Sequence, residues 1–128
     1  PIFGVCLGLQ AIAEYFGGTL DQLDVPMHGK PSRVMICDPG VAFDGLPETI
    51  TIGRYHSLHA KADCLPDVLK ITAQTADQIV MGLQHKSLPV AAVQFHPESI
   101  MSLGQDAGLR IIENVVSQLV PSEKTKVA

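Results

Sequence analysis

Long apolar runs are missing from this sequence of 128 residues. The longest, such as residues 89–93, extend over only a few positions, whereas a membrane-spanning helix needs roughly 20. An excess of basic residues is missing too, because nine Lys and Arg residues stand against thirteen Asp and Glu residues and the net charge is −4. These absences predict a soluble protein and give no reason to expect a nucleic-acid partner.

Paired cysteines are also missing. The three cysteines are an odd number at unrelated spacings, which does not suit the disulfide framework of a small secreted protein. Cys37 lies in an apolar run, as buried core thiols do. No basic segment followed by an apolar one resembles a secretion signal, and the first residue is Pro1 rather than Met. We expect a cytoplasmic protein whose sequence begins inside a longer chain.

Repeats and low-complexity segments are absent, and the composition does not change along the chain, so one globular domain is expected. Short apolar runs bounded by turn residues predict strands at 1–6, 33–37, 49–55, 68–74, 79–84 and 90–95. Helical spacing of apolar residues follows the first run and returns near the C-terminus. The pattern predicts an α/β fold with a mixed, largely parallel sheet flanked by helices.

The C-terminal helical segment has one apolar face. The residues on that face are Leu109, Ile112, Val115, Val116 and Leu119. We expect this face to cover the sheet. Pro121 follows it, and the last residues are mostly polar. The domain is therefore expected to occupy residues 1–120, and a polar tail residues 121–128.

The first candidate for chemistry is the segment Gly4-Val5-Cys6-Leu7-Gly8. It has the layout of a nucleophile elbow, in which a strand turns sharply into a helix and the central side chain is exposed for reaction. The N-terminus of the following helix would favour the thiolate form of Cys6. Taken alone, these five residues fit a structural cysteine before a glycine turn equally well.

A second segment, Gln94-Phe95-His96-Pro97-Glu98, decides between these readings. His96 and Glu98 are two residues apart, so the imidazole and the carboxylate project to the same side at the end of an apolar strand. Alone they would also fit a turn with a solvated histidine. Together with the elbow they predict that His96 takes a proton from Cys6 and that Glu98 holds the imidazole tautomer. The chemistry would be acyl transfer through a thioester.

Three motifs at 4–10, 54–58 and 94–99 resemble class I glutamine amidotransferases, and they occur in the family's order. Residues 27–30, 53–57 and 99–104 are similar to the amidotransferase domain of anthranilate synthase, especially the form fused to its synthase domain. The resemblance covers nearly the whole chain and implies a flavodoxin-like architecture, truncated at the N-terminus. The family's first strand and glycine-rich loop precede Pro1, so we expect this segment alone to be inactive and prone to aggregate.

The resemblance also implies functional roles. Gln10, Ser57 and Leu58 would contact the glutamine substrate, and the backbone amide of Leu7 would form part of the oxyanion hole. Ammonia would pass to a chorismate-using synthase domain, fused N-terminally, that makes anthranilate for tryptophan synthesis. No cofactor is implied for this segment, whereas Mg²⁺ is implied for the synthase partner domain.

Other histidines carry weaker signals. His56 and His59 are three residues apart, but the spacing offers no further ligands, so no metal site is expected. His28 and Lys30 flank a glycine and fit either partner contacts or a solvated turn. His85 and Lys86 lie between two predicted strands and are expected in water.

Three other functions share parts of this pattern. The amidotransferase of aminodeoxychorismate synthase, which serves folate synthesis, has the same motifs. A noncatalytic amidotransferase-like module that regulates a synthase would tolerate an incomplete site. Related α/β proteins with a cysteine and a histidine include peptidases and other hydrolases.

Overall fold

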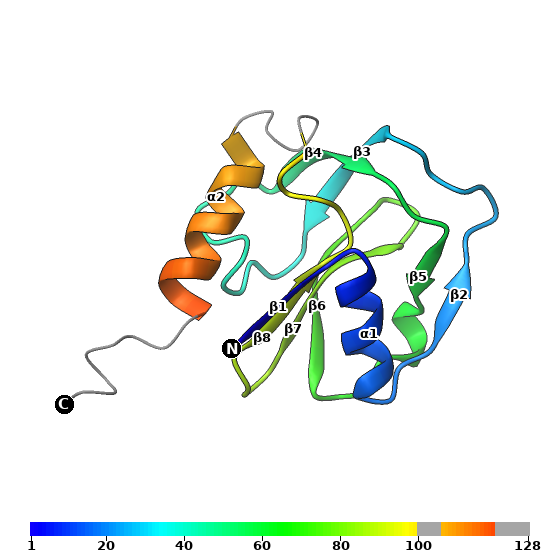
Figure 1. Cartoon of the computed structure of the whole chain (residues 1–128), viewed down its shortest axis with the longest axis horizontal. Helices are drawn as coiled ribbons and strands as arrows, with labels where there is room; N and C mark the ends of the chain where they lie inside the picture. The colour runs from blue at the N-terminus through cyan, green and yellow to red at the C-terminus, as the bar shows by residue number, and fades with distance from the viewer. Residues whose placement is uncertain (100–105, 120–128) are drawn as a thin grey trace.

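A computed structural model of the chain describes residues 1–99 and 106–119 (Figure 1). Its main sheet has six strands in the order β1-β8-β7-β6-β3-β4. These strands are β1 Ile2–Val5, β3 Lys30–Ile36, β4 Thr49–Arg54, β6 Leu69–Gln74, β7 Val80–His85 and β8 Val90–Val93. A small antiparallel sheet lies beside it and consists of β2 Leu20–Gln22 and β5 Leu58–Ala60. A short 3₁₀ helix, Ala62–Cys64, follows β5.

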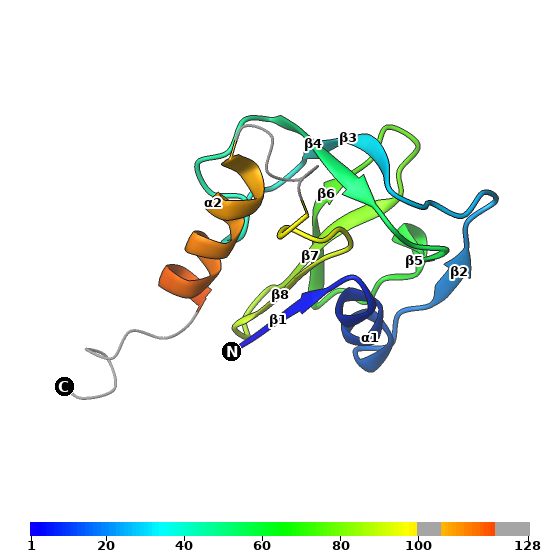
Figure 2. The same ribbon diagram turned by 45° about the horizontal axis from the view of Figure 1, so that its top comes forward.

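Helices cover the main sheet from both sides. Helix α1, Leu7–Tyr15, and helix α2, Ala107–Asn114, lie on opposite sides of it in both ribbon views (Figures 1 and 2). The α1 side packs a cluster that includes Leu9 and Leu83, and the α2 side packs one that includes Phe95. Because both faces are covered, all four residues of β8 are buried.

The expected α/β class with a mixed sheet and flanking helices is confirmed, but the largely parallel pairing is wrong for the described strands. Among them, β1 and β8 make the one parallel pair, and the other four pairs of the main sheet are antiparallel. Residues 75–79 join β6 to β7, and residues 86–89 join β7 to β8. Such short connections make hairpins, whereas a parallel crossover needs a dozen residues or more.

The predicted apolar face of α2 is also wrong in part. Leu109, Ile112 and Val116 are 51%, 38% and 66% exposed, while Ile111 is fully buried. The orientation follows from Asn114, whose Nδ2 donates hydrogen bonds to the carbonyls at 42 and 44 over 2.9 and 2.8 Å. A π-helical turn, Val115–Leu119, continues the helix, and Leu119 is buried as expected.

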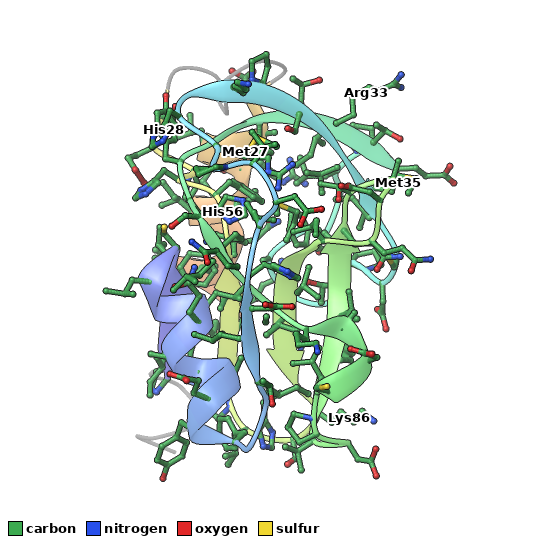
Figure 3. The ribbon with its side chains drawn as sticks, turned by 90° about the vertical axis from the view of Figure 1, so that its right-hand side faces the viewer. Met27, His28, Arg33, Met35, His56 and Lys86 are labelled. Atoms are coloured by element: carbon green, nitrogen blue, oxygen red, sulfur yellow. The ribbon has the colours of Figure 1, made fainter. Side chains whose placement is uncertain are left out.

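Two side chains have the opposite environment to the expected one. Cys37 is exposed because it lies just beyond the end of β3. His85 is buried, and its Nδ1 accepts hydrogen bonds from the backbone amides of Ser87 and Leu88 at 3.0 and 2.9 Å. Lys86, labelled in Figure 3, is exposed as expected. The polar tail at 121–128 and most of the motif at 99–104 lie outside the described residues.

Candidate active site

Cys6 occupies the turn between β1 and α1. Its φ is 55° and its ψ is −101°, a positive-φ conformation that is uncommon for a residue with a Cβ. Gly4 is needed here, since a Cβ at that position would lie 2.7 Å from the carbonyl carbon of Gly8. A Cβ on Gly8 itself would meet nothing within 4 Å. The predicted elbow is confirmed, and the steric requirement for glycine falls on position 4.

The parallel pairing of β1 with β8 brings the two predicted motifs together. Val5 is opposite Val93 in the register, and the backbone amide of Cys6 donates to the carbonyl of Val93 over 2.9 Å. The segment 94–98 therefore leaves the sheet beside Cys6. This is the carboxyl edge of the two parallel strands, where ligands bind in open α/β sheets.

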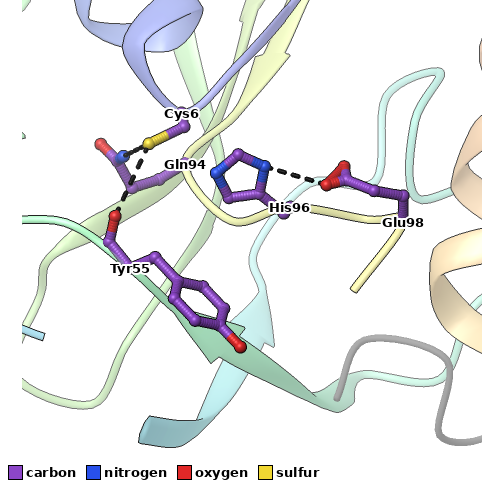
Figure 4. A network of polar contacts seen from close by, with 5 residues as sticks. All are labelled: Cys6, Tyr55, Gln94, His96 and Glu98. Carbon is purple, nitrogen blue, oxygen red and sulfur yellow. Dashed lines mark hydrogen bonds and ion pairs between the residues drawn. The ribbon is translucent and has the colours of Figure 1, made fainter. Parts of the chain in front are cut away.

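His96 and Glu98 form a pair next to Cys6 (Figure 4). His96 Nδ1 lies 2.9 Å from Glu98 Oε2, and Figure 4 shows the other ring nitrogen on the Cys6 side. A carboxylate accepts only, so Nδ1 carries the proton and Nε2 is free to accept one. The Tyr55 ring lies edge-on to the imidazole, with centroids 6.1 Å apart. The pair has the geometry of a base and its orienting partner.

The sulfur of Cys6 contacts two groups from other segments (Figure 4). Gln94 Nε2 donates to Sγ over 3.6 Å, and the thiol lies 3.9 Å from the Tyr55 carbonyl oxygen, an acceptor. Burial raises the pKa of Cys6, and the charge of Glu98 adds to the rise. Hydrogen bonds from the Leu7 amide and from Gln94 lower the pKa, but by less. The expected preference for thiolate is therefore wrong, and Cys6 rests as a thiol that needs a base.

Two of the residues implied as substrate contacts meet at this site. Gln10 is 4% exposed, and its Nε2 donates to the Leu58 carbonyl over 3.1 Å and to Gln94 Oε1 over 3.2 Å. Ser57 is exposed and lies just before β5. The exposed Leu7 side chain follows Cys6 at the start of α1. Gln10 thus lies two hydrogen bonds from Cys6, and the Leu58 carbonyl lies one further along the same chain of contacts.

A buried pair inside the motif at 54–58, for which the sequence predicted no role, supports the Leu58 carbonyl. Arg54 Nε donates to His56 Nε2 over 3.0 Å, and His56 Nδ1 donates to the Leu58 carbonyl over 2.8 Å. Burial lowers the pKa of His56, and the Arg54 charge lowers it further. His56 is therefore neutral, with both ring nitrogens engaged. The sequence signal for this pair was that Arg54 and His56 are two residues apart at the end of a predicted strand, so their side chains share one side.

Backbone hydrogen bonds attach the loop between β2 and β3 to the segment 54–57, which contains Arg54 and His56. Backbone amides of Leu23, Met27 and Gly29 donate to the carbonyls of residues 57, 56 and 54 at 2.8, 2.9 and 2.7 Å. Figure 3 shows Met27 and His28 on the side of the molecule that holds His56. His28 and Lys30 are exposed, so both readings of them stay open.

A hollow borders the His96–Glu98 pair. It is a cavity of about 320 Å³, lined by Tyr55, His96, Glu98 and Ser99. In the described part of the chain, no three His, Cys, Asp or Glu side chains gather as metal ligands. Among the same residues, no helix has the length and apolar character of a membrane span.

Comparisons with known proteins identify a family and several relatives. The model of the family "Glutamine amidotransferase class-I" matches residues 1–117. Over all 128 residues, the chain is 54% identical to an anthranilate synthase of Azospirillum brasilense, and it covers 17% of that protein. It is 43% identical over 121 residues, 94% of the chain, to the aminodeoxychorismate/anthranilate synthase component 2 of Bacillus subtilis, of which it covers 62%.

A solved structure is similar as well. A candidate GMP synthase subunit from Thermoplasma acidophilum superposes on the whole chain with a TM-score of 0.88 at 30% identity, and the chain covers 61% of it. The chain thus spans less than two thirds of each of these proteins. Since the family model matches nearly all of the sequence, the chain belongs to the class-I glutamine amidotransferase family.

Proposed function

We propose that this chain carries the nucleophile half of a glutaminase site, in which Cys6 attacks the side-chain amide of glutamine. One observation carries the proposal. The thiol of Cys6 lies on a strained turn beside a histidine whose far nitrogen is held 2.9 Å from a carboxylate. A thiol, a base and an orienting acid in this order are the parts of a covalent acyl-transfer site.

The proposed reaction runs in two halves. His96 Nε2 takes the Cys6 proton, and the sulfur attacks the amide carbon of glutamine to give a tetrahedral oxyanion. The Leu7 amide is proposed as one donor to that oxyanion. His96 returns the proton to the amide nitrogen, so ammonia leaves and a thioester remains. Water, activated by His96, then hydrolyses the thioester to glutamate and restores the Cys6 thiol.

Substrate binding is proposed for Gln10, Ser57 and Leu58. Both hydrogens of the Gln10 amide nitrogen already have acceptors at 3.1 and 3.2 Å. Gln10 therefore offers the substrate its Oε1, an acceptor suited to an N–H group of glutamine. The proposal is supported by the position of Gln10 within two hydrogen bonds of the Cys6 sulfur.

The ammonia is proposed to pass to an N-terminally fused synthase domain that converts chorismate to anthranilate for tryptophan synthesis. The name and the greater length of the Azospirillum brasilense relative support this partner. The Bacillus subtilis relative is named for aminodeoxychorismate as well, which supports the folate pathway as the second candidate. Mg²⁺ in the synthase domain, a cytoplasmic location and inactivity of the isolated segment stay predictions.

The test compares two nitrogen sources in the full-length protein, with chorismate and Mg²⁺ present. Replacing Cys6 by Ser should lower glutamine-dependent anthranilate formation by about 100-fold or more. Formation from added ammonium salt should stay within about twofold, since that route does not need the thiol. If the glutamine-dependent rate survives Cys6→Ser, Cys6 is structural. If the product is p-aminobenzoate after lyase treatment rather than anthranilate, the folate pathway is the right one.

A noncatalytic regulatory module predicts a different result. Such a module would turn over no glutamine in the native protein, and Cys6→Ser would change neither rate. A peptidase or other hydrolase would be labelled at Cys6 by general electrophiles but would not prefer a diazo-ketone analogue of glutamine. Protection of Cys6 from that analogue by added glutamine would support the glutaminase.

A further inference from the structure

Gln94 has no assigned role in the chemistry above, yet it is the side chain behind the sulfur of Cys6 (Figure 4). It is completely buried, in the first position after β8. Its Nε2 lies 3.6 Å from Cys6 Sγ. In a folded protein, the C=O and the NH₂ of a buried side-chain amide usually each have a hydrogen-bond partner.

The orientation of the Gln94 amide follows from a chain of hydrogen bonds. The Leu58 carbonyl can only accept, so the group of Gln10 that faces it over 3.1 Å is the amide nitrogen. The same nitrogen faces Gln94 over 3.2 Å, so the Gln94 atom at that point is the acceptor, Oε1. The other end of Gln94, which faces Cys6, is therefore the NH₂ donor.

A buried donor aimed at sulfur favours the charged form of the nucleophile. The thiol has the Tyr55 carbonyl to donate to, at 3.9 Å, whereas the thiolate can only accept. Once the Cys6 proton moves to His96, the hydrogen bond from Gln94 becomes charge-assisted and strengthens. The other ionisable side chains at the described site are His96, Glu98 and Tyr55, and the charge of Glu98 raises the pKa of Cys6.

We propose that Gln94 is a positioning residue that holds the Cys6 thiolate through its amide donor, with Gln10 and the Leu58 carbonyl setting the direction of that donor. The proposal rests on the proposed function for its meaning in catalysis. One hydrogen-bond network, which runs from Leu58 through Gln10 and Gln94 to Cys6, connects the proposed glutamine contacts to the nucleophile. Filling the substrate site would then act on the same hydrogen bonds that hold the sulfur.

The test measures the ionisation of Cys6 directly in the full-length protein. Cys37 and Cys64 are exposed, so both are first replaced by Ser to leave Cys6 as the reporting thiol of this chain. Peptide mass spectrometry follows the alkylation of Cys6 by iodoacetamide as a function of pH. Gln94→Met keeps the bulk of the side chain but removes the donor, and it should raise the apparent pKa by about one pH unit. Gln94→Glu keeps the shape and adds a negative charge, so its shift should be larger.

Kinetics and a matched control complete the test. Gln94→Met should lower kcat for glutamine about tenfold, since the interaction with Cys6 strengthens only as the thiolate forms. The control is Gln84→Met. Gln84 lies on β7 of the same sheet, and its Oε1 accepts from the Val41 amide over 2.8 Å, a hydrogen bond that Met removes. This variant should leave the pKa of Cys6 unchanged. Thermal unfolding shows whether each variant folds.

Two outcomes would overturn the proposal. Unchanged alkylation profiles in folded Gln94→Met and Gln94→Glu proteins would mean that Gln94 only fills space. An equal shift in Gln84→Met would mean that loosening of the sheet causes the effect. Alkylation needs no turnover, so a shift confined to the Gln94 variants supports the proposal even if Cys6→Ser leaves glutamine use intact. Intact glutamine use in the Cys6→Ser variant would overturn the proposed function but not the role of Gln94 in holding the thiolate.

Discussion

Gly4 and Gly8 face each other across the turn that carries Cys6. A Cβ at position 4 would lie 2.7 Å from the Gly8 carbonyl carbon and 2.9 Å from Ile12 Cδ1, whereas a Cβ at position 8 has open space. Cys6 has its positive φ in the turn at which β1 and the first turn of α1 approach this closely. One glycine in the pair is therefore a steric necessity and the other is not.

The two glycines should respond differently to the same change. Gly4→Ala should lower the free energy of unfolding by about 1–3 kcal/mol, because backbone and Ile12 must move to admit the methyl group. Gly8→Ala, at the second position of α1, should change it by less than about 1 kcal/mol, since alanine favours helix. Chemical denaturation of both variants makes the measurement. Equal losses would contradict the steric account.

The direction in which α2 faces the sheet can be tested on its own residues. Asn114→Leu should lower the free energy of unfolding by about 2–4 kcal/mol, because it removes two hydrogen bonds and leaves the carbonyls of Ala42 and Asp44 without this donor. Ile112→Asn, the reverse exchange on the outer side of the helix, should cost about 1 kcal/mol or less. Urea titrations of the two variants compare these effects. A larger loss for Ile112→Asn would restore the face expected from the sequence.

Stability should fall as the pH drops through the range in which His56 titrates. Its pKa is lowered in the folded protein from an ordinary value of 6.5, so the unfolded chain binds this proton more readily. The contribution of neutral His56 is therefore fully present above that ordinary value and is lost as the pH falls toward the lowered one. Denaturation between pH 7.5 and 5, roughly the range on either side of an ordinary histidine pKa, measures it.

The matched control for this effect is His56→Asn, which cannot take up the proton. This variant should be less stable at neutral pH, because the link between Arg54 and the Leu58 carbonyl is lost. Its loss of stability on acidification should be shallower than that of the native protein. Parallel pH dependences would show that His56 is not the titrating group.

Glu98→Gln should separate the two effects of this carboxylate. Loss of its negative charge should lower the pKa of Cys6, since the charge of Glu98 raises it. The amide can donate to His96 Nδ1 and hold the wrong tautomer, so kcat for glutamine should still fall by about 100-fold or more. Alkylation profiles give the first quantity and steady-state kinetics the second. A fall in kcat accompanied by a raised pKa would assign Glu98 another role.

Much of the candidate site could be predicted from neighbouring residues. The turn at Cys6 and the start of α1 depend on local backbone sterics, so the glycine spacing was informative. His96 and Glu98 share a side because alternate residues of an extended segment do so. The meeting of Cys6 with His96 was predicted from the motifs, and the register of β1 against β8 provides the physical means.

Packing across the chain decided what the sequence pattern could not. Gln94 contacts Cys6 from 88 positions away, and Gln10 contacts Gln94 from 84 positions away. The exposure of Cys37 depends on where β3 ends, and the burial of His85 depends on the loop amides that it accepts from. The rotation of α2 depends on the loop carbonyls that Asn114 binds.

The sequence by itself determined the chemical identities in the site and the local turns that present them, because those depend on residue type and on spacings of a few positions. The tertiary structure alone decided the antiparallel pairing of most strands, the raised pKa of Cys6 and the direction of the Gln94 amide. These are set by burial and by hydrogen-bond partners that meet only when the strands assemble, so no local pattern records them.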